Sequence, residues 1–283
     1  MRSDYGVQEL CEALEVSKSG YYRWRHRPTG AQQRSNERLL DEIKIIHQDK
    51  HLRNYGSPRM KAELNLRGYP CSENRVARLM AKNGISAQHH RKWKPRTTIQ
   101  NPRHKPSKNH LKALPAVTAP GQVWVSDITY VFTGVMTCYL AVVMDLFSRR
   151  IVGWEFHLNM ESSLVMRALS QAESKHPDFK GRIFHSDRGS QYSSNLLRNH
   201  LDDEGYTQSM SALGYCYDNA VCESFFATLK KESFPENQCF ETPQEARREI
   251  FSYLETFYNS RRLHSSLGMT SPNDYHQLYL QTN

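Results

Sequence analysis

The chain contains no apolar run near the roughly 18 residues that a membrane-spanning helix needs. Its first residues, MRSDYGVQEL, do not place an apolar stretch after a basic start, so they do not resemble a secretory signal. These absences exclude the membrane and secreted classes. We therefore expect a cytoplasmic, non-membrane protein whose 283 residues, 38% of them hydrophobic, suffice for a sizeable core and about two domains.

Cysteine is scarce and irregularly spaced. The six cysteines are Cys11, Cys71, Cys138, Cys216, Cys222 and Cys239. None forms a CxxC pair, and no His pair stands at zinc-finger spacing. Disulfide frameworks belong to smaller secreted chains, so we expect free thiols and no structural zinc.

Acidic residues are missing from one long segment. Between Glu73 and Asp127 lie 53 residues without Asp or Glu, and these contain 11 of the 38 Lys and Arg residues. Elsewhere 29 acidic side chains outnumber the basic ones, so the net charge of +9 is regional. A segment of one sign attracts polyanions. A solvated tail has a similar composition, but the length of this segment and Trp93 within it favour nucleic-acid binding.

Helical patterns occupy the first 87 residues. Residues 1–27 contain a helix ending near Leu14 and a second that begins after Ser17. Residues 34–87 contain three more, which begin near Asn36, near Pro58 and after Ser72. Two helices joined by a tight turn, with basic residues leading the second, are typical of helix-turn-helix proteins. Small bundles without a DNA role share this pattern, but the adjacent basic segment favours a helix-turn-helix-like segment at 1–27 and a DNA-binding domain at 34–87.

The candidate DNA contacts in this half are basic side chains. They are Arg75 and Arg78 in the last of these helices, and Arg91, Lys92, Lys94 and Arg96 in the segment that follows. Residues 88–119 are rich in Pro, Lys, Arg and His and have no periodicity. This composition predicts a basic linker.

From residue 120 the pattern changes to strands. Three segments are rich in β-branched and aromatic residues: 122–132, 136–156 with a turn at 148–150, and 181–187. A helix is expected at 162–176, and further helices follow the third segment. This order predicts an α/β catalytic core with a mixed sheet, spanning residues 120–280.

Three carboxylates are the candidate catalytic residues. Asp127 and Asp187 are each expected at the end of a strand, where chemistry collects in open α/β sheets. Glu223 lies opposite the apolar stripe of an amphipathic helix. Each acid alone could be a cap, turn or surface residue. Together they would repel one another unless a cation joined them, and hard oxygen ligands suit Mg²⁺ or Mn²⁺.

These motifs together resemble the OrfB-type transposases of small bacterial insertion sequences, whose catalytic core is of the retroviral-integrase, ribonuclease H-like type. The matching stretches are WVSDIT, HSDRGSQY, DNAVCESFFATLKKE, FYNSRRLHSSLGMTSP and, in the first half, VSKSGYYRW and YGSPRMKAELNLRGYPCSENRVARLM. The 35 residues between Asp187 and Glu223 match the family's interval. The zinc module of retroviral integrases and the leucine-zipper segment of the family's upstream reading frame are absent from this sequence.

The resemblance implies DNA cleavage at the element's terminal repeats, followed by attack of the freed 3′-hydroxyl on target DNA. Asp127, Asp187 and Glu223 would hold two Mg²⁺ ions, for which Mn²⁺ could substitute. The implied partners are double-stranded DNA of the element ends and of the target, further copies of the chain on DNA, and an upstream-frame partner or fusion. Lys230, two helical turns beyond Glu223, would contact the DNA backbone, although a surface lysine is the simpler interpretation.

Other interpretations remain open at this point. A metal-dependent nuclease or resolvase on the same fold would keep the three acids without joining strands, whereas a DNA-binding regulator would lack the acids. Ser126 and Ser186 adjoin the aspartates without a His and acid to activate them, so we interpret both as structural. His185 could support a metal site or simply pack.

Overall fold

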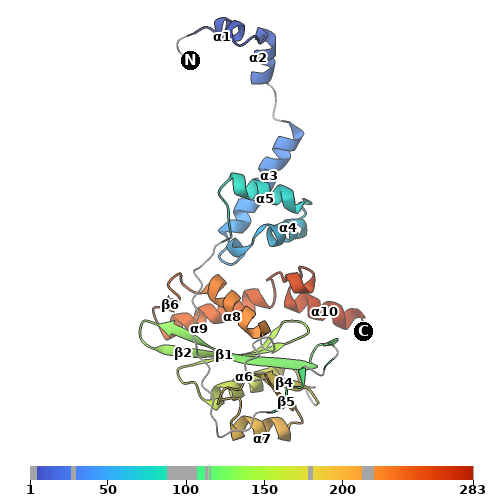
Figure 1. Cartoon of the computed structure of the whole chain (residues 1–283), viewed down its shortest axis with the longest axis vertical. Coiled ribbons are helices and arrows are strands. Elements are labelled where there is room, and N and C mark those ends of the chain that lie inside the picture. The colour runs from blue at the N-terminus through green and yellow to red at the C-terminus, as the bar shows by residue number, and fades with distance from the viewer. Residues whose placement is uncertain are drawn as a thin grey trace.

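The computed structural model describes residues 5–26, 30–87, 107–111, 114, 116–177, 181–211 and 220–282. Two short N-terminal helices lead to a group of three helices and then to a mixed sheet with helices on both faces (Figure 1). The candidate DNA contacts Arg91, Lys92, Lys94 and Arg96 lie outside the described residues.

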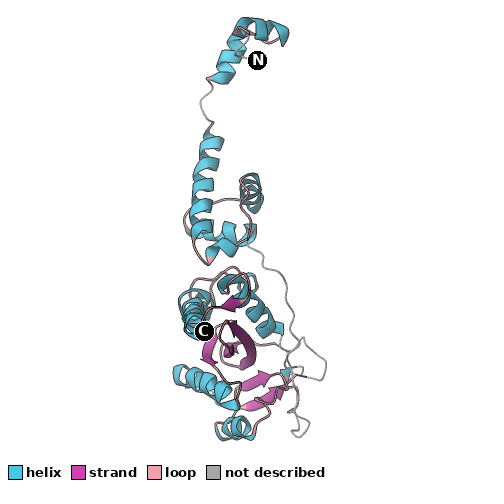
Figure 2. Cartoon of the chain, turned by 90° about the vertical axis from the view of Figure 1, so that its left-hand side faces the viewer, coloured by secondary structure: helices cyan, strands magenta, loops and turns pink. Residues whose placement is uncertain are grey.

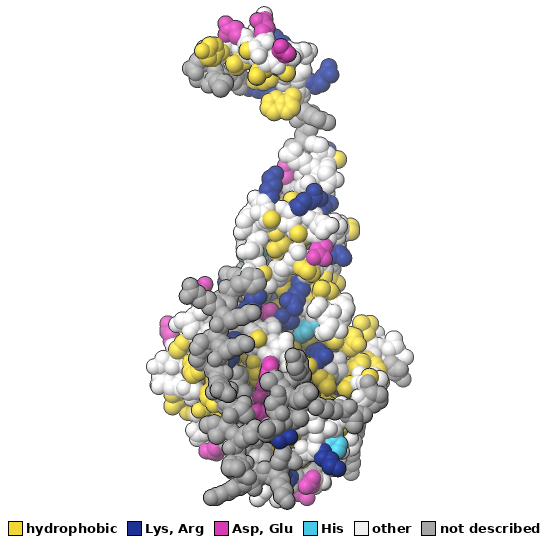
Figure 3. All heavy atoms as spheres, viewed as in Figure 1, with side chains coloured by type: hydrophobic (Ala, Val, Ile, Leu, Met, Phe, Trp, Pro, Cys, Tyr) yellow, Lys and Arg dark blue, Asp and Glu magenta, His cyan; other side chains and the backbone are white. Residues whose placement is uncertain are grey.

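The N-terminal pair consists of α1 (Val7–Ala13) and α2 (Lys18–Arg25). Ser17 caps α2 by accepting a hydrogen bond from the Gly20 N–H at 3.0 Å, which explains the expected helix start. Leu14 and Trp24 are more than 70% exposed. Figure 3 shows hydrophobic side chains on the surface of this pair.

The second helical group contains α3 (Ala31–Gln48), α4 (Ser57–Leu66) and α5 (Glu73–Lys82), with a short 3₁₀ turn, η1 (Leu52–Asn54), between α3 and α4. The helix start expected near Asn36 is wrong, because α3 already begins at Ala31, after Gly30 in extended conformation. Pro58 stands in the first turn of α4, where its missing N–H costs nothing. Ser72 caps α5 as expected.

The sheet has the strand order β3-β2-β1-β4-β5, with β6 paired to the far end of β1. Its strands are β1 (Val123–Thr133), β2 (Thr137–Asp145), β3 (Ile151–His157), β4 (Ile183–Ser186), β5 (Thr207–Met210) and β6 (Cys239–Phe240). The first three strands are antiparallel neighbours, whereas β4 and β5 run parallel to β1. The expectation of an α/β domain with a mixed sheet is therefore confirmed.

Each face of the sheet has its own hydrophobic cluster. On one face, Trp124 packs with α6 (Ser162–Lys175) and α7 (Asn195–Asp203). On the other, Val123 and Val125 pack with α8 (Ala220–Ser233), α9 (Pro243–Phe251) and the π-helix η4 (Ser252–Tyr258). Figure 2 shows helices on both sides of the strands. We call these the α6 face and the α8 face.

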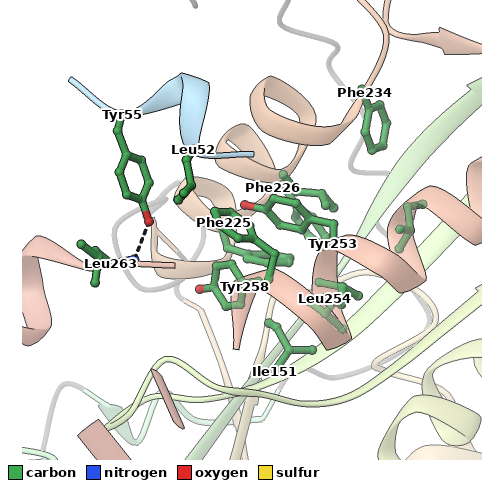
Figure 4. Close-up of a cluster of buried hydrophobic side chains, with 14 of the residues drawn as sticks. Leu52, Tyr55, Ile151, Phe225, Phe226, Phe234, Tyr253, Leu254, Tyr258 and Leu263 are labelled. Carbon is green, nitrogen blue, oxygen red and sulfur yellow. Dashed lines mark hydrogen bonds between the residues drawn. The ribbon is translucent and has the colours of Figure 1, made fainter. Parts of the chain in front are cut away.

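The α3–α5 group joins the cluster of the α8 face. The Leu263 N–H donates a hydrogen bond to the Tyr55 hydroxyl at 3.0 Å, as drawn in Figure 4. The His51 ring stacks on Phe257 with centroids 4.7 Å apart. Leu52 and Leu64 belong to the same buried cluster as Leu254. The helical group is thus packed against the segment that follows α9, which continues through η5 (Ser265–Leu267) to α10 (Pro272–Thr282).

Candidate active site

Strand pairing brings the two candidate aspartates side by side. The parallel ladder between β1 and β4 ends at the pair Ser126 and Ser186, so Asp127 and Asp187 are the next residues on each strand. Alternation along β1 places Asp127 on the same face as Val125, which is the α8 face. Both carboxylates therefore adjoin the edge of the sheet that α8 covers.

The expected position of Asp127 at the end of its strand is wrong. Asp127 lies within β1, which continues to Thr133 as one arm of a hairpin with β2. Only the parallel pairing with β4 stops at Ser126. The end of the parallel ladder is the feature that brings the two carboxylates together. Asp187 directly follows β4, so its expected position at the end of a strand is confirmed.

Both aspartates are short of positive charge. The Asp127 Oδ1 accepts a hydrogen bond from the Ile128 N–H, and the Asp187 Oδ1 accepts one from the Gly189 N–H, each at 2.9 Å. Burial raises the pKa of Asp127 well above its usual range, and the negative charge of Asp187 raises it further. Burial also raises the pKa of Asp187. Two crowded carboxylates of this kind favour a shared cation.

Helix α8 supplies the third acid and a lysine. Glu223 is exposed in the first turn, and its charge contributes to the raised pKa of Asp127. Lys230 is half-buried, and burial lowers its pKa while Asp127 opposes that shift. Asp127 is thus close enough to Glu223 and Lys230 to interact with both electrostatically. This agrees with the prediction that Glu223 and Lys230 share one face of α8.

The donor chemistry of the site suits a divalent cation. Within the described part of the chain, no three His, Cys, Asp or Glu side chains already stand at metal-binding spacing. Asp127, Asp187 and Glu223 nevertheless offer hard carboxylate oxygens of the kind that Mg²⁺ prefers. No described Lys or Arg forms an ion pair with either aspartate, and burial raises the pKa of both. These residues fit Mg²⁺ by chemistry, although the structure does not show a formed ligand set.

A buried tyrosine beneath Asp127 had no role assigned from the sequence. The Tyr192 hydroxyl lies 2.9 Å from the Ser126 Oγ, which donates to the Val142 carbonyl at 2.8 Å. This network holds β1 and β2 to the segment that follows Asp187. The sequence signal was present, because Tyr192 is the last residue of the quoted stretch HSDRGSQY.

The residues next to the aspartates are engaged in packing. The His185 ring nitrogens lie 2.9 Å from the Ser209 Oγ and 3.2 Å from the Ser211 Oγ, which favours the packing alternative for this histidine. The Ser186 Oγ donates to the Asp187 carbonyl at 2.9 Å. Together with the buried Ser126, these contacts agree with the structural roles expected for both serines.

The two described arginines of the predicted DNA-reading helix differ. Arg75 is half-buried and donates to the Asn36 Oδ1 and the Ser35 Oγ, both at 2.8 Å, which ties α5 to α3. Arg78 is exposed, and its Nε lies 3.4 Å from the Asn74 carbonyl of its own helix. Of the two, Arg78 has the surface position that a phosphate contact requires.

Comparison with known proteins identifies the family. Models of the integrase core domain match residues 117–216 and 204–272, and a model of an HTH-like domain matches residues 34–93. The transposase for insertion sequence element IS904 of Lactococcus lactis is 39% identical over 88% of this chain and 98% of its own length. The transposase InsF for insertion sequence IS3A of Escherichia coli is 34% identical over 97% of this chain and 95% of its own. The chain belongs to the insertion-sequence transposases with an integrase core.

Two more similarities were found. A 31 kDa protein of insertion element IS600 from Shigella sonnei is 39% identical over 96% of the transposase described here. A chain in the cryo-EM structure of the simian T-cell lymphotropic virus intasome in complex with PP2A regulatory subunit B56 gamma aligns over 84% of this chain and 74% of its own, with a TM-score of 0.47 and 14% sequence identity. The fold is the ribonuclease H-like integrase core, preceded by an HTH-like region. Among the described residues, no helix is both long and apolar enough to cross a membrane.

Proposed function

We propose that this transposase cleaves DNA at the ends of its insertion sequence and joins the freed 3′ ends to target DNA, in a reaction that depends on divalent metal ions. The observation that carries this proposal is the pairing of Asp127 and Asp187 at the end of a parallel ladder, with Glu223 close enough to act on Asp127. Crowded acids at a sheet edge are costly for folding alone, so they point to metal-assisted chemistry.

In the proposed mechanism, Asp127, Asp187 and Glu223 would together hold the Mg²⁺ ions. Bound metal would supply charge neutralisation at the phosphorus and a more acidic attacking water or hydroxyl. The Gly189 N–H keeps one oxygen of Asp187 oriented, and the Ile128 N–H does the same for Asp127. Ser126 and Tyr192 lock β1 beneath these carboxylates, so that their relative position survives DNA binding.

The remaining partners follow from the same proposal. The α3–α5 group and the basic segment 88–119 would bind the terminal repeats, with Arg78 on phosphate, while the core binds target DNA. Lys230 would hold the DNA backbone beside the scissile bond as a point charge. Assembly of several copies on DNA, and an upstream-frame partner or fusion, remain predictions of the family resemblance.

Neutralising each acid in turn tests the proposal. We expect Asp127→Asn, Asp187→Asn and Glu223→Gln to abolish Mg²⁺-dependent cleavage and joining of labelled element ends, with DNA binding and thermal stability nearly unchanged. Asp202→Asn, which neutralises an exposed acid on α7, is the matched control and should retain full activity. Activity within about tenfold of wild type for any of the three would contradict the proposed ligand set, since even outer-shell changes cost 10–100-fold.

The same assay separates joining from cleavage. A plasmid target and gel analysis of joined product distinguish a transposase reaction from that of a nuclease or resolvase. Cut ends without joined product, under conditions where both DNA molecules are bound, would favour the nuclease.

A further inference from the structure

A pocket lies on the side of α8 that faces away from the two aspartates. It has a volume of about 300 Å³ and is formed by segments far apart in the sequence, including Arg59 of α4, Arg149 of the β2–β3 turn, and Arg262 with His264 after η4. Helix α8 contributes Ser224 and Thr228. None of the described side chains that line the pocket is an Asp or Glu. Its lining therefore offers hydrogen-bond donors and positive charge.

The three arginines of the pocket are not equivalent. Arg262 donates two hydrogen bonds of 2.7 Å to Glu232, so its charge is matched. Arg59 donates to the Leu263 carbonyl at 2.9 Å and lies over the Tyr55 ring. The Arg149 side chain makes no hydrogen bond or ion pair with any described residue, and its Nη1 is buried. Of the three arginines of the pocket, Arg149 is thus the one whose guanidinium has no partner among the described residues.

The position of Arg149 is costly in two ways. Its φ of 63° lies in the left-handed region, which side chains other than Gly and Asn seldom adopt. Burial lowers its pKa, and Asp145, which acts on it weakly, already accepts hydrogen bonds from Gly121 and Ser148. A strained backbone and a half-buried cation without an anionic partner are costly to keep, and strained residues cluster at sites that bind ligands. The missing partner is an anion.

Phosphate is the anion that matches this geometry. A guanidinium presents a planar fork that binds two phosphate oxygens, and hydroxyls such as Ser224 and Thr228 can donate to the remaining oxygens. Helix α8 carries both Glu223 of the candidate active site and Ser224 and Thr228 of the pocket, so DNA held at the active site would lie against the helix that forms the pocket. We propose that the pocket binds one non-scissile backbone phosphate of the DNA strand that the active site engages, with Arg149 as its principal ligand. This inference rests on the proposed function, because it assumes that the active site acts on DNA.

Salt-dependent binding of element-end DNA without divalent metal tests the proposal independently of catalysis. We expect Arg149→Ala to weaken binding and to flatten the slope of log K against log salt by about 0.9, the value for one phosphate on duplex DNA. Arg149→Lys should restore part of the affinity, because it keeps the charge and loses the fork. Arg167→Ala removes the same charge from the α6 side and should leave the slope unchanged. An unchanged slope and affinity in a folded Arg149→Ala protein would overturn the proposal.

A stability measurement separates ligand binding from a structural role. Gly accepts positive φ without strain, so Arg149→Gly should melt at or above the wild-type temperature and still bind DNA less tightly. Lower stability with normal DNA affinity would assign Arg149 to folding and overturn the proposal.

Neutral methylphosphonate at single positions of the end DNA identifies the phosphate. At one position the substitution should weaken wild-type binding and leave Arg149→Gly binding unaffected. The absence of any such position would overturn the proposal. Inorganic phosphate tests whether the ligand is free phosphate instead of DNA. If it raises the melting temperature of the wild-type protein as much as DNA does, and this increase is lost in Arg149→Gly, then free phosphate and not DNA is the ligand. Failure of strand joining with these binding results intact would affect the proposed function alone.

Discussion

The two faces of the sheet are built differently. The cluster of the α6 face consists of apolar and aromatic side chains such as Val143, Leu164 and Leu169. Both faces bury charge. On the α6 face the buried Asp145 accepts hydrogen bonds from the Gly121 and Ser148 N–H groups. The α8 face buries the pair of Glu232 and Arg262 and also carries Asp127, which forms no ion pair with a described residue. The α8 face thus differs in carrying the groups that our proposals assign to ligands.

This difference has a physical cost. Apolar burial on the α6 face stabilises the fold in proportion to the area removed from water. A charge that is taken from water loses hydration and needs a partner in exchange. Glu232 is this partner for the buried Arg262, and our proposals assign metal to the half-buried Asp127 and phosphate to the half-buried Arg149. Both faces therefore stabilise the fold, whereas the groups that our proposals assign to ligands lie on the α8 side of β1.

Breaking the buried pair of the α8 face should have the largest effect. Glu232→Met leaves the Arg262 guanidinium buried without an anion, so we expect the free energy of unfolding to fall by about 3–5 kcal/mol. The double change Glu232→Met with Arg262→Met should recover much of this loss. Urea denaturation measures the free energy of unfolding of both variants.

The control for this prediction is an ion pair on the α6 side. Glu155→Gln breaks the partly exposed pair with Arg167 and should cost under about 1 kcal/mol. Equal losses for the two sides would contradict the comparison.

The α6 face should be sensitive to volume instead of charge. A Cβ on Gly153 of β3 would stand 2.1 Å from the Ala168 carbonyl of α6, which is far inside van der Waals contact. Gly153→Ala should therefore push α6 from the sheet and cost about 3 kcal/mol in urea unfolding. Gly30→Ala, where the added Cβ meets nothing within 4 Å, is the control and should change stability by under about 1 kcal/mol. If Gly153→Ala leaves the free energy of unfolding unchanged, α6 is not tightly packed against β3.

Acid should weaken the α8 face through His264. Burial and the neighbouring Arg262 lower the pKa of His264 from 6.5 to about 3. Between these values the unfolded chain binds the extra proton and the folded chain does not, so stability falls as pH drops through this window and is retained above 6.5. We expect His264→Gln to reduce the slope of unfolding free energy against pH there by up to about 1.4 kcal/mol per unit. Identical slopes for both proteins would refute this.

The smallest expected effect concerns two adjacent lysines of α8. Lys230 and Asp127 influence each other, whereas no such coupling to Asp127 is expected for Lys231, one residue further around the helix. Lys230→Ala should weaken binding of processed ends and reduce the salt slope by about one phosphate contact. Lys231→Ala should do neither. Equal salt titrations for the two variants would show that Lys230 contributes only general charge.

Much of the local structure was predictable because it depends on short-range chemistry. Ser17 and Ser72 cap their helices by bonding backbone N–H groups three residues ahead, and Pro58 stands where a helix start tolerates it. The start of α3 was mispredicted because Gly30 supplies no side-chain cap that marks it.

The sequence alone determined the family motifs, the identities of the candidate acids and the helix that carries Glu223, since each follows from residue type and spacing within one segment. Tertiary structure alone decided that the parallel pairing of β1 ends next to Asp127, because the extent of a ladder depends on the partner strand. It alone also decided that Arg149 has no partner among the described residues while Arg262 has one. Burial and charge pairing are properties of segments that meet in space, and the sequence separation of Arg59, Arg149 and Arg262 leaves no local pattern from which their meeting could be inferred.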